Sequence, residues 1–118
     1  IKLPKRIPYH IAMEMLLTGR WVDAEEASRW GFVNQIHTAD TLLSEARKMA
    51  DHIASGPPLV IAAIKEIVRN AEDMKFQDAL NKIVRSQFAT VEKLYNSEDQ
   101  LEGARAFAEK REPVWKGR

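Results

Sequence analysis

The sequence predicts a mainly α-helical chain with one short strand near residues 32–36. Two observations predict the helices. Apolar side chains recur every three or four residues through most of the chain, which is the period of one buried helix face. These stretches begin after residues that cap helix N-termini, such as Asp23 and Ser97. They end at glycines such as Gly19 and Gly31, which adopt a left-handed backbone without a Cβ penalty.

The first part of the chain is predicted to form two short helices, each ended by one of these glycines. Pro8 fits the first turn of a helix, where its missing N–H is not needed, and that helix should end at Gly19. Asp23 and Glu26 have the three-residue spacing of a capping box. The second helix should therefore begin at about Ala24.

The segment Phe32–Ile36 is predicted to be a short strand. It alternates apolar and polar residues, and its apolar residues favour extended backbone. A strand this short needs a neighbour to pair with, and no second clear strand follows in the chain. The sequence therefore predicts a strand whose partner must come from elsewhere.

Two amphipathic helices are predicted to follow. The first should start near Thr38 or Asp40 and continue to residue 53, because Gly56 and two prolines then stop it. Pro58 should open the second. Residues 59–64 of this helix are all apolar, so its first half should be covered on several sides.

The remainder of the chain is predicted to contain the longest helix and a final helix. The helical period continues from residue 76 to residue 95, which is about five turns. Ser97 and Gln100 form a second capping-box spacing, so the last helix should run from there to about Arg111. Pro113 should prevent it from continuing.

Composition excludes several classes of function. The 118 residues, 45% of them hydrophobic, suffice for the core of one domain. With 18 basic and 17 acidic residues, the chain lacks the charge excess typical of proteins that bind nucleic acid or anionic membranes. Cysteine is absent, which excludes disulfides and thiolate chemistry, and no apolar run is long enough to span a bilayer. We expect a cytoplasmic protein.

The sequence contains few candidate catalytic residues. His10, His37 and His52 fall on separate elements without metal-ligand spacing, so no metal site is predicted. Glu25 and Glu26 are better explained by helix capping and the helix dipole than by general acid–base chemistry. No phosphate-binding loop, dinucleotide fingerprint or serine-nucleophile motif is present. The residues therefore predict no catalytic group.

Short motifs at both ends of the chain carry a family resemblance. They are Leu17-Thr18-Gly19, Asp23-Ala24-Glu25-Glu26-Ala27, Trp30-Gly31-Phe32-Val33-Asn34, and the run from Ser97 to Gly103 followed by Ala106 to Arg118. In this order they resemble the segment that follows the active site in the crotonase (enoyl-CoA hydratase/isomerase) superfamily. The last dozen residues are most similar to its carnitinyl-CoA dehydratase branch, also called carnitine racemase.

The resemblance implies that the chain is the C-terminal helical region of a crotonase-like α/β fold. In the family, a Leu-Pro pair like Leu3-Pro4 follows shortly after the second catalytic acid. Residues 1–36 would then join the missing catalytic core to a helical oligomerisation region, residues 37–118. Family members form trimers and often hexamers, so a homo-oligomer is expected, and a swapped oligomer for the fragment alone.

The resemblance also implies the chemistry of the parent enzyme. Family members bind an acyl-CoA thioester in an oxyanion hole and move protons with carboxylates, through an enolate. The oxyanion hole and the catalytic glutamates would lie upstream of Ile1. The fragment alone is therefore expected to be inactive, and no catalytic residue is carried over to it. CoA would enter as part of the substrate and not as a separate cofactor.

Two residues match positions that contact CoA in the family. Lys110, within Phe107-Ala-Glu-Lys-Arg111, matches a lysine that reaches the CoA pyrophosphate, often in an adjoining subunit. A competing interpretation is that Lys110 and Arg111 complement the negative end of the last helix. Val91 matches a position that contacts the adenine and is aromatic in some relatives. Because valine cannot stack on the adenine, packing is the better explanation for this residue.

Gly103 and the tryptophans suggest close packing. A glycine inside a helix costs about 1 kcal/mol relative to alanine, so Gly103 should permit the close approach of another backbone or of a ligand, with close packing favoured. Trp21, Trp30 and Trp115 are predicted to be core or edge-of-core residues in preference to interface residues.

A second hypothesis of a different class stays open at this stage. The capping signals at most helix ends would allow the chain to fold independently, as a self-contained helical interaction module without catalysis. A nucleic-acid-binding role is a distant third hypothesis, because no motif or charge pattern supports it.

Overall fold

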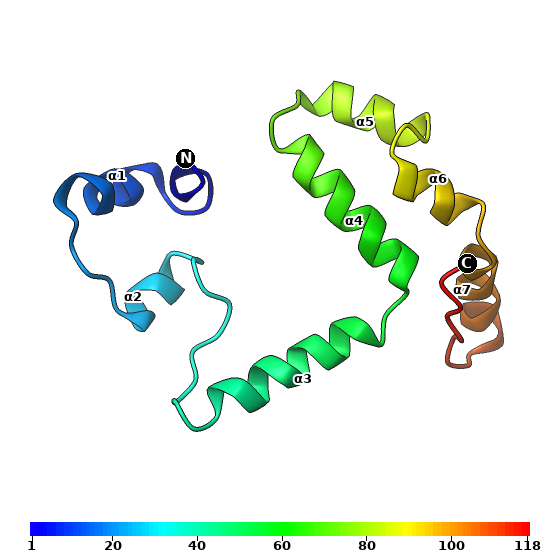
Figure 1. Ribbon diagram of the computed structural model, residues 1–118, viewed down its shortest axis with the longest axis horizontal. Coiled ribbons are helices and arrows are strands. Elements are labelled where there is room, and N and C mark those ends of the chain that lie inside the picture. The colour runs from blue at the N-terminus through cyan, green and yellow to red at the C-terminus, as the bar shows by residue number, and fades with distance from the viewer. The chain divides into compact units, whose positions relative to one another are not determined.

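The computed structural model describes residues 1–118, and every regular element in it is a helix (Figure 1). The elements are η1 (Leu3–Lys5), α1 (Tyr9–Thr18), α2 (Ala24–Arg29), α3 (Leu42–Ala54), α4 (Pro58–Ala71), α5 (Phe76–Val84), α6 (Ala89–Tyr95) and α7 (Glu98–Glu109). The prediction of a mainly α-helical chain is confirmed.

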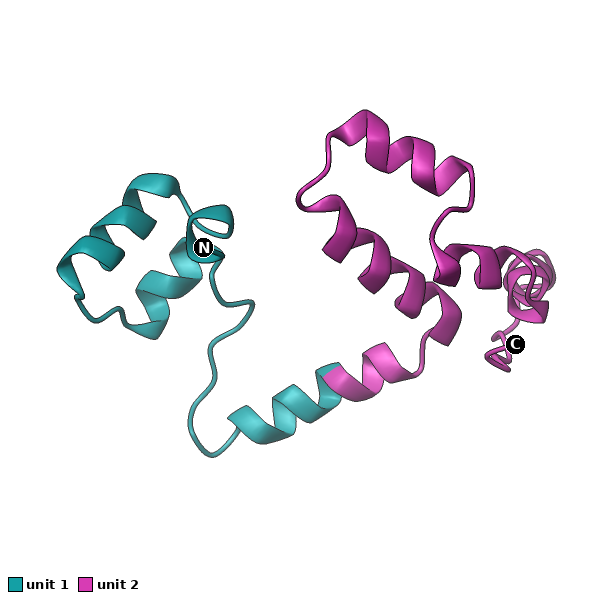
Figure 2. Ribbon diagram, turned by 45° about the horizontal axis from the view of Figure 1, so that its top comes forward, with its two compact units in different colours: residues 1–49 teal, residues 50–118 magenta.

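The chain divides into two compact units, residues 1–49 and residues 50–118 (Figure 2). The division predicted at residue 36 is not a boundary between compact units. It marks where a catalytic core would join the helical region, and it stays a prediction. None of the helices is both long and apolar enough to cross a bilayer.

In the first unit, the predicted start of α2 and the predicted glycine ends of α1 and α2 are confirmed. The Asp23 carboxylate accepts a hydrogen bond from the Glu26 backbone N–H at 2.7 Å, and α2 begins at Ala24. Gly19 ends α1 with φ of 65°, and Gly31 follows α2 with φ of 69°. Both glycines thus occupy left-handed positions that close a helix.

The first unit is also held by a cluster of charged side chains around Arg20. The guanidinium pairs with Glu14 at 2.6 Å and with both carboxylate oxygens of Glu26, at 2.8 and 2.9 Å. It also lies 5.5 Å from the centroid of the Trp30 ring, within the range of a cation–π contact. Arg20 therefore links α1 to α2.

The prediction of a strand near residues 32–36 is wrong. These residues form bends and irregular backbone, and the chain contains no strand. A strand needs a neighbour to accept and donate its ladder hydrogen bonds, and no other segment of this chain supplies one. The alternating pattern alone therefore does not produce a strand here.

The prediction of one long helix over residues 76–95 is also wrong. The helix is interrupted between α5 and α6, where Ser86 takes a left-handed φ of 51°. The Ser86 N–H donates to the Ile83 carbonyl at 2.9 Å, and the Gln87 N–H donates to the Lys82 carbonyl at 2.9 Å. This pair of bonds is the Schellman pattern that ends a helix. The turn allows Phe88, which is only 5% exposed, to enter the core.

The core of the second unit is small. Its buried members are Ala63, Phe88 and Val91. Partly buried apolar residues pack around them, namely Ile67, Ile83 and Leu94. Glu66 of α4 caps the start of α6, because its carboxylate accepts hydrogen bonds from the Thr90 backbone N–H at 2.9 Å and from the Thr90 hydroxyl. These contacts join α4 to α6.

One of the three tryptophans is more exposed than predicted. Trp21 is 97% exposed, so its assignment to the core is wrong. Trp30 and Trp115 are half-buried. Several other large apolar side chains of both units lie in solvent, including Leu17, Phe76, Val84 and Phe107. The helices of this chain thus leave much of their apolar surface uncovered.

Candidate functional site

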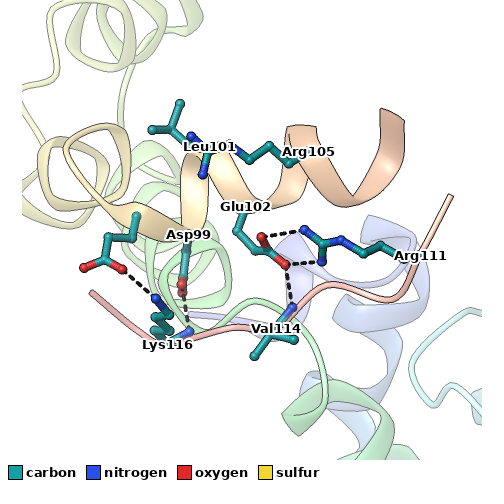
Figure 3. A pocket seen from close by; sticks show the side chains of 8 residues that line it. Asp99, Leu101, Glu102, Arg105, Arg111, Val114 and Lys116 are labelled. Atoms are coloured by element: carbon teal, nitrogen blue, oxygen red, sulfur yellow. Dashed lines mark hydrogen bonds and ion pairs between the residues drawn. The ribbon is translucent and has the colours of Figure 1, made fainter. Parts of the chain in front are cut away.

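The C-terminal tail, residues 110–118, turns back and lies along α7 (Figure 3). At its far end, the Glu98 backbone N–H at the start of α7 donates to the Arg118 carbonyl oxygen at 2.8 Å. The tail therefore retraces the helix from its last residue to its first. We call the side chains that hold the tail against α7 the tail clamp; its central members are Asp99, Glu102 and Arg111.

Glu102 binds both a side chain and a backbone group of the tail. Its carboxylate oxygens accept hydrogen bonds from the two terminal nitrogens of Arg111 at 2.6 and 3.0 Å. One of these oxygens also accepts from the Val114 backbone N–H at 2.9 Å. The Arg111 guanidinium and the Val114 N–H together lower the pKa of Glu102 to about 2. Glu102 therefore stays ionised at neutral pH and fixes two points of the tail.

Asp99 holds the tail one helical turn earlier. Its two carboxylate oxygens accept hydrogen bonds from the backbone N–H groups of Lys116 at 2.7 Å and Gly117 at 2.8 Å. Asp99 is only 3% exposed. A buried carboxylate needs such partners, because an unpaired buried charge is costly. Nearby, the Lys116 ammonium pairs with the exposed carboxylate of Glu98 at 2.9 Å.

Gly103 allows the tail to approach α7 closely. A Cβ atom built at Gly103 would lie 3.3 Å from the Trp115 ring, closer than ordinary van der Waals contact. The predicted close approach is therefore made by an aromatic side chain of the tail and not by another backbone.

A pocket of about 340 Å³ lies between α7 and the tail. Its wall is mostly charged, with Leu101 and Val114 as its apolar members; the charged lining consists of Glu98, Asp99, Glu102, Arg105, Arg111 and Lys116. Most of these charges are already paired with one another across the clamp. Arg105 makes no hydrogen bond or ion pair. After the Arg111 guanidinium and the Val114 N–H, the charge of Arg105 also helps to lower the pKa of Glu102.

Lys110 lies at the turn between α7 and the tail. It is the residue that caps α7, with a left-handed φ of 54°. The Lys110 N–H donates to the Phe107 carbonyl at 3.3 Å, and the Arg111 N–H donates to the Ala106 carbonyl at 3.1 Å, again the Schellman pattern. The Lys110 side chain is exposed and makes no hydrogen bond or ion pair. Its ammonium is therefore available to an anion.

The structure separates the two predicted binding residues. Val91 is 3% exposed and lies in the core with Ala63 and Phe88. Lys110 lies in solvent at the end of α7. Packing thus accounts for Val91 in this structure, and its contact with a ligand stays a prediction.

A second hollow, of about 420 Å³, lies in the first unit between α3 and the segment before it. It is lined mainly by apolar and uncharged side chains, among them Phe32, Val33, Leu42 and Met49. No group of three or more His, Asp or Glu side chains is placed to hold a metal ion. His10 and His52 are exposed, and a ring nitrogen of His37 forms a hydrogen bond with the Gln35 side chain at 3.0 Å.

The sequence did not reveal the tail clamp. Glu102 and Arg111 are nine residues apart, which is not a spacing at which helical side chains meet. Asp99 and Lys116 are separated by 17 residues. The one local signal was the pair Gly103 and Pro113, a small residue inside a helix and a residue that stops it.

Comparison with known proteins gives a consistent result. The family model described as enoyl-CoA hydratase/isomerase matches residues 1–118. A carnitinyl-CoA dehydratase from Citrobacter koseri is 45% identical over the whole chain, which covers 45% of that protein. One from Proteus mirabilis is 44% identical, with the same coverage. The chain thus spans less than half the length of these relatives, and it corresponds to their C-terminal part.

Solved structures of similar sequence have the same fold over this region. An enoyl-CoA hydratase from Mycobacterium marinum is 38% identical, with a TM-score of 0.86 over 98% of this chain and 44% of that chain. One from Bacillus anthracis is 32% identical, with a TM-score of 0.87 over 99% of this chain and 44% of that chain. The helices described above are therefore those of the C-terminal region of such proteins.

Proposed function

Because the chain belongs to the enoyl-CoA hydratase/isomerase family, we propose that it is the C-terminal helical part of an enzyme that hydrates, dehydrates or isomerises an acyl-CoA. The observation that carries the proposal is the family match over residues 1–118. The chain supplies less than half of such a protein, so the catalytic groups would come from the remainder. The parent enzyme would be a cytoplasmic homo-oligomer.

The names of two relatives support a proposal for the acyl group of the substrate. Proteins 44 and 45% identical to this chain bear the name carnitinyl-CoA dehydratase. We therefore propose carnitinyl-CoA, or its dehydration product crotonobetainyl-CoA, as the substrate of the parent. A direct comparison of turnover between crotonobetainyl-CoA and crotonyl-CoA tests this; equal or faster turnover of crotonyl-CoA would contradict it.

Lys110 is proposed to bind the pyrophosphate of CoA. Its ammonium is exposed and unpaired, and the neighbouring Arg111 is already paired with Glu102 and Glu109. An ammonium near a phosphate forms a charge-assisted contact, which is stronger than a neutral hydrogen bond. Of the two adjacent cations, Lys110 is therefore the better phosphate ligand. Val91, which is buried, is proposed only as part of the apolar support beneath the adenine end.

The test of Lys110 uses the full-length parent enzyme. Lys110→Ala should raise KM for the acyl-CoA substrate about tenfold with little change in kcat, because it removes one charged contact to the substrate. Lys93→Ala is the matched control, since Lys93 is an exposed lysine of α6 in the same unit. An unchanged KM in Lys110→Ala, or an equal rise in Lys93→Ala, would overturn the assignment.

The isolated chain tests where catalysis lies. Residues 1–118 alone should not hydrate crotonyl-CoA, whereas the full-length parent should. Hydration by the isolated chain at a rate near that of the parent would contradict the proposal.

The alternative function is a self-contained helical interaction module. The two N-cap hydrogen bonds formed by Asp23 and Ser97 favour independent helix formation. The exposure of Phe107 (87%) and Phe76 (80%) instead favours a chain that needs further protein to cover it. Sedimentation and hydrogen exchange separate the two: a monomer with well-protected amides would support the module.

A further inference from the structure

At the turn that ends α7, Lys110 has a left-handed backbone conformation, which is unfavourable for a residue with a side chain. Lys110 has φ of 54°, and a left-handed backbone costs a residue with a side chain about 1–2 kcal/mol. Glycine is the usual residue at this position of a helix end. A lysine here needs contacts beyond the turn that hold it in place.

Glu102 supplies those contacts. Its carboxylate binds the Arg111 guanidinium through two hydrogen bonds, one residue after Lys110, and binds the Val114 backbone N–H, four residues after Lys110. Arg111 also donates to the Glu112 carbonyl at 3.2 Å, inside the same turn. Figure 3 shows Glu102 facing Arg111 and Val114 from α7. The segment that follows Lys110 is therefore fixed to the helix that precedes it.

Glu102 also determines which of the two adjacent cations, Lys110 or Arg111, is without a carboxylate partner. It occupies both terminal nitrogens of Arg111, and Glu109 takes the remaining one at 2.6 Å. Each of the three nitrogens of the Arg111 side chain thus has an acceptor, while the Lys110 side chain is exposed and makes no hydrogen bond or ion pair. Without Glu102, residues 110–114 would lose their attachment to α7, and the turn that places Lys110 would lose its support.

We propose that Glu102 is a positioning residue for phosphate binding by Lys110: it pairs with Arg111, fixes residues 110–114, and holds the Lys110 ammonium toward the pyrophosphate of an acyl-CoA. This inference rests on the proposed function of Lys110. Glu102 itself does not touch the substrate.

The test compares two thioesters in the full-length parent enzyme. Crotonyl-CoA contains the pyrophosphate, and S-crotonylpantetheine lacks it. Glu102→Ala should raise KM for crotonyl-CoA about fivefold and leave kcat unchanged, since it weakens one ground-state contact. KM for S-crotonylpantetheine should change by less than about twofold. A merely structural role would alter both substrates alike, which would overturn the proposal.

The double variant tests whether Glu102 acts through Lys110. In a Lys110→Ala background, Glu102→Ala should add less than about twofold to KM for crotonyl-CoA, because the contact it supports is already gone. A full and additive fivefold effect would overturn the inference while leaving Lys110 as a phosphate ligand. If Lys110→Ala alone has no effect, the proposed role of Lys110 fails together with the inference, while the proposed acyl-CoA chemistry of the parent, which rests on the family match, is unaffected.

Two further variants complete the test. Glu102→Gln keeps an oxygen for the Val114 N–H but loses the charge that binds Arg111, so it should have a smaller, equally CoA-selective effect and serves if the alanine variant does not fold. Glu109→Ala is the matched control, since Glu109 pairs with the same Arg111 but is exposed and holds no backbone group. Its effect on KM should stay below about twofold.

Discussion

The helix ends of the two units are closed in the same way by different residues. In residues 1–49, the left-handed position after α1 is Gly19 and the one after α2 is Gly31. In residues 50–118, the corresponding positions after α5 and α7 are Ser86 and Lys110. Glycine adopts this backbone freely, whereas serine and lysine do so at a cost. The first unit therefore ends its helices by local sequence, and the second needs tertiary contacts.

Those tertiary contacts differ in kind at the two positions. After Ser86 the chain is held by an apolar contact, because Phe88 is buried against Ala63 and Val91. After Lys110 it is held by charges, because Glu102 binds Arg111 and the Val114 N–H. Removing either anchor should release a turn of the second unit, and no such anchor is needed in the first.

The largest effect is expected from the apolar anchor. Phe88→Ala should lower the free energy of unfolding of residues 50–118 by about 3 kcal/mol, since it removes a buried aromatic ring from a small core. Urea denaturation followed by circular dichroism measures this. Phe76→Ala is the control, because Phe76 is 80% exposed and should cost little. Equal losses in the two variants would show that Phe88 does not anchor the turn.

The next effect is expected from the buried carboxylate of the tail clamp. Asp99→Ala should destabilise the second unit by about 2 kcal/mol, because it leaves the N–H groups of Lys116 and Gly117 without their charged acceptor. Hydrogen exchange of these two amides should accelerate. Glu98→Ala, which removes an exposed carboxylate, should leave both amides protected. Unchanged protection in Asp99→Ala would contradict this account of the clamp.

A smaller effect is expected from exchanging the residues at the left-handed positions. Gly31→Ala should destabilise the chain by about 1 kcal/mol, and the cause is backbone strain alone, because nothing lies within 4 Å of the added Cβ. Ser86→Gly should stabilise it by about 0.5 kcal/mol, since strain relief is partly offset by the entropy of a glycine. Thermal unfolding measures both. If both variants changed the stability in the same direction, the proposed difference between the helix ends of the two units would be contradicted.

The smallest effect is a pH dependence confined to the tail. The pKa of Glu102 is lowered to about 2 from an ordinary value of 4.5, so its contribution to stability is fully present above about 4.5 and is lost as the pH falls through about 2. Trp115, kept as the only tryptophan, should report release of the tail over this range by its fluorescence. Glu102→Gln should abolish the transition. A transition that persists in this variant would assign it to another group.

Much of the fold could be predicted from the sequence because its signals are local. The start of α2 follows from the spacing of Asp23 and Glu26, and the start of α7 follows from the spacing of Ser97 and Gln100. Each cap joins residues three positions apart, so a short window of sequence contains the whole interaction. The family resemblance is confirmed by the family match over residues 1–118.

The interruption between α5 and α6 could not be predicted in this way. The helical period continues through residues 76–95. Serine is not a residue type that indicates a left-handed backbone position, so Ser86 gave no sign that a helix ends there. The break depends on Phe88 packing against Ala63, which is 25 positions earlier in the chain. Periodicity describes one helix face and contains no information about such a partner.

The role of Lys110 in the candidate site stays a prediction. The resemblance indicated Lys110, and the structure shows that this residue is an exposed, unpaired cation at the end of α7. The residues that surround it were missed, because Glu102 meets Arg111 only after the tail has reversed direction. Gly103 indicated a close approach, and only the structure identified Trp115 as the group that makes it.

The sequence by itself determined where most helices begin and end, and to which family the chain belongs, since both depend on residues close together along the chain. Only the tertiary structure decided that residues 32–36 form no strand, that Ser86 interrupts a helix, and that the tail is clamped to α7. The physical reason is the same in each case. A strand needs a neighbouring strand, a strained turn needs a contact that holds it, and a buried carboxylate needs hydrogen-bond donors. In each case the required group lies far away in the sequence or is absent.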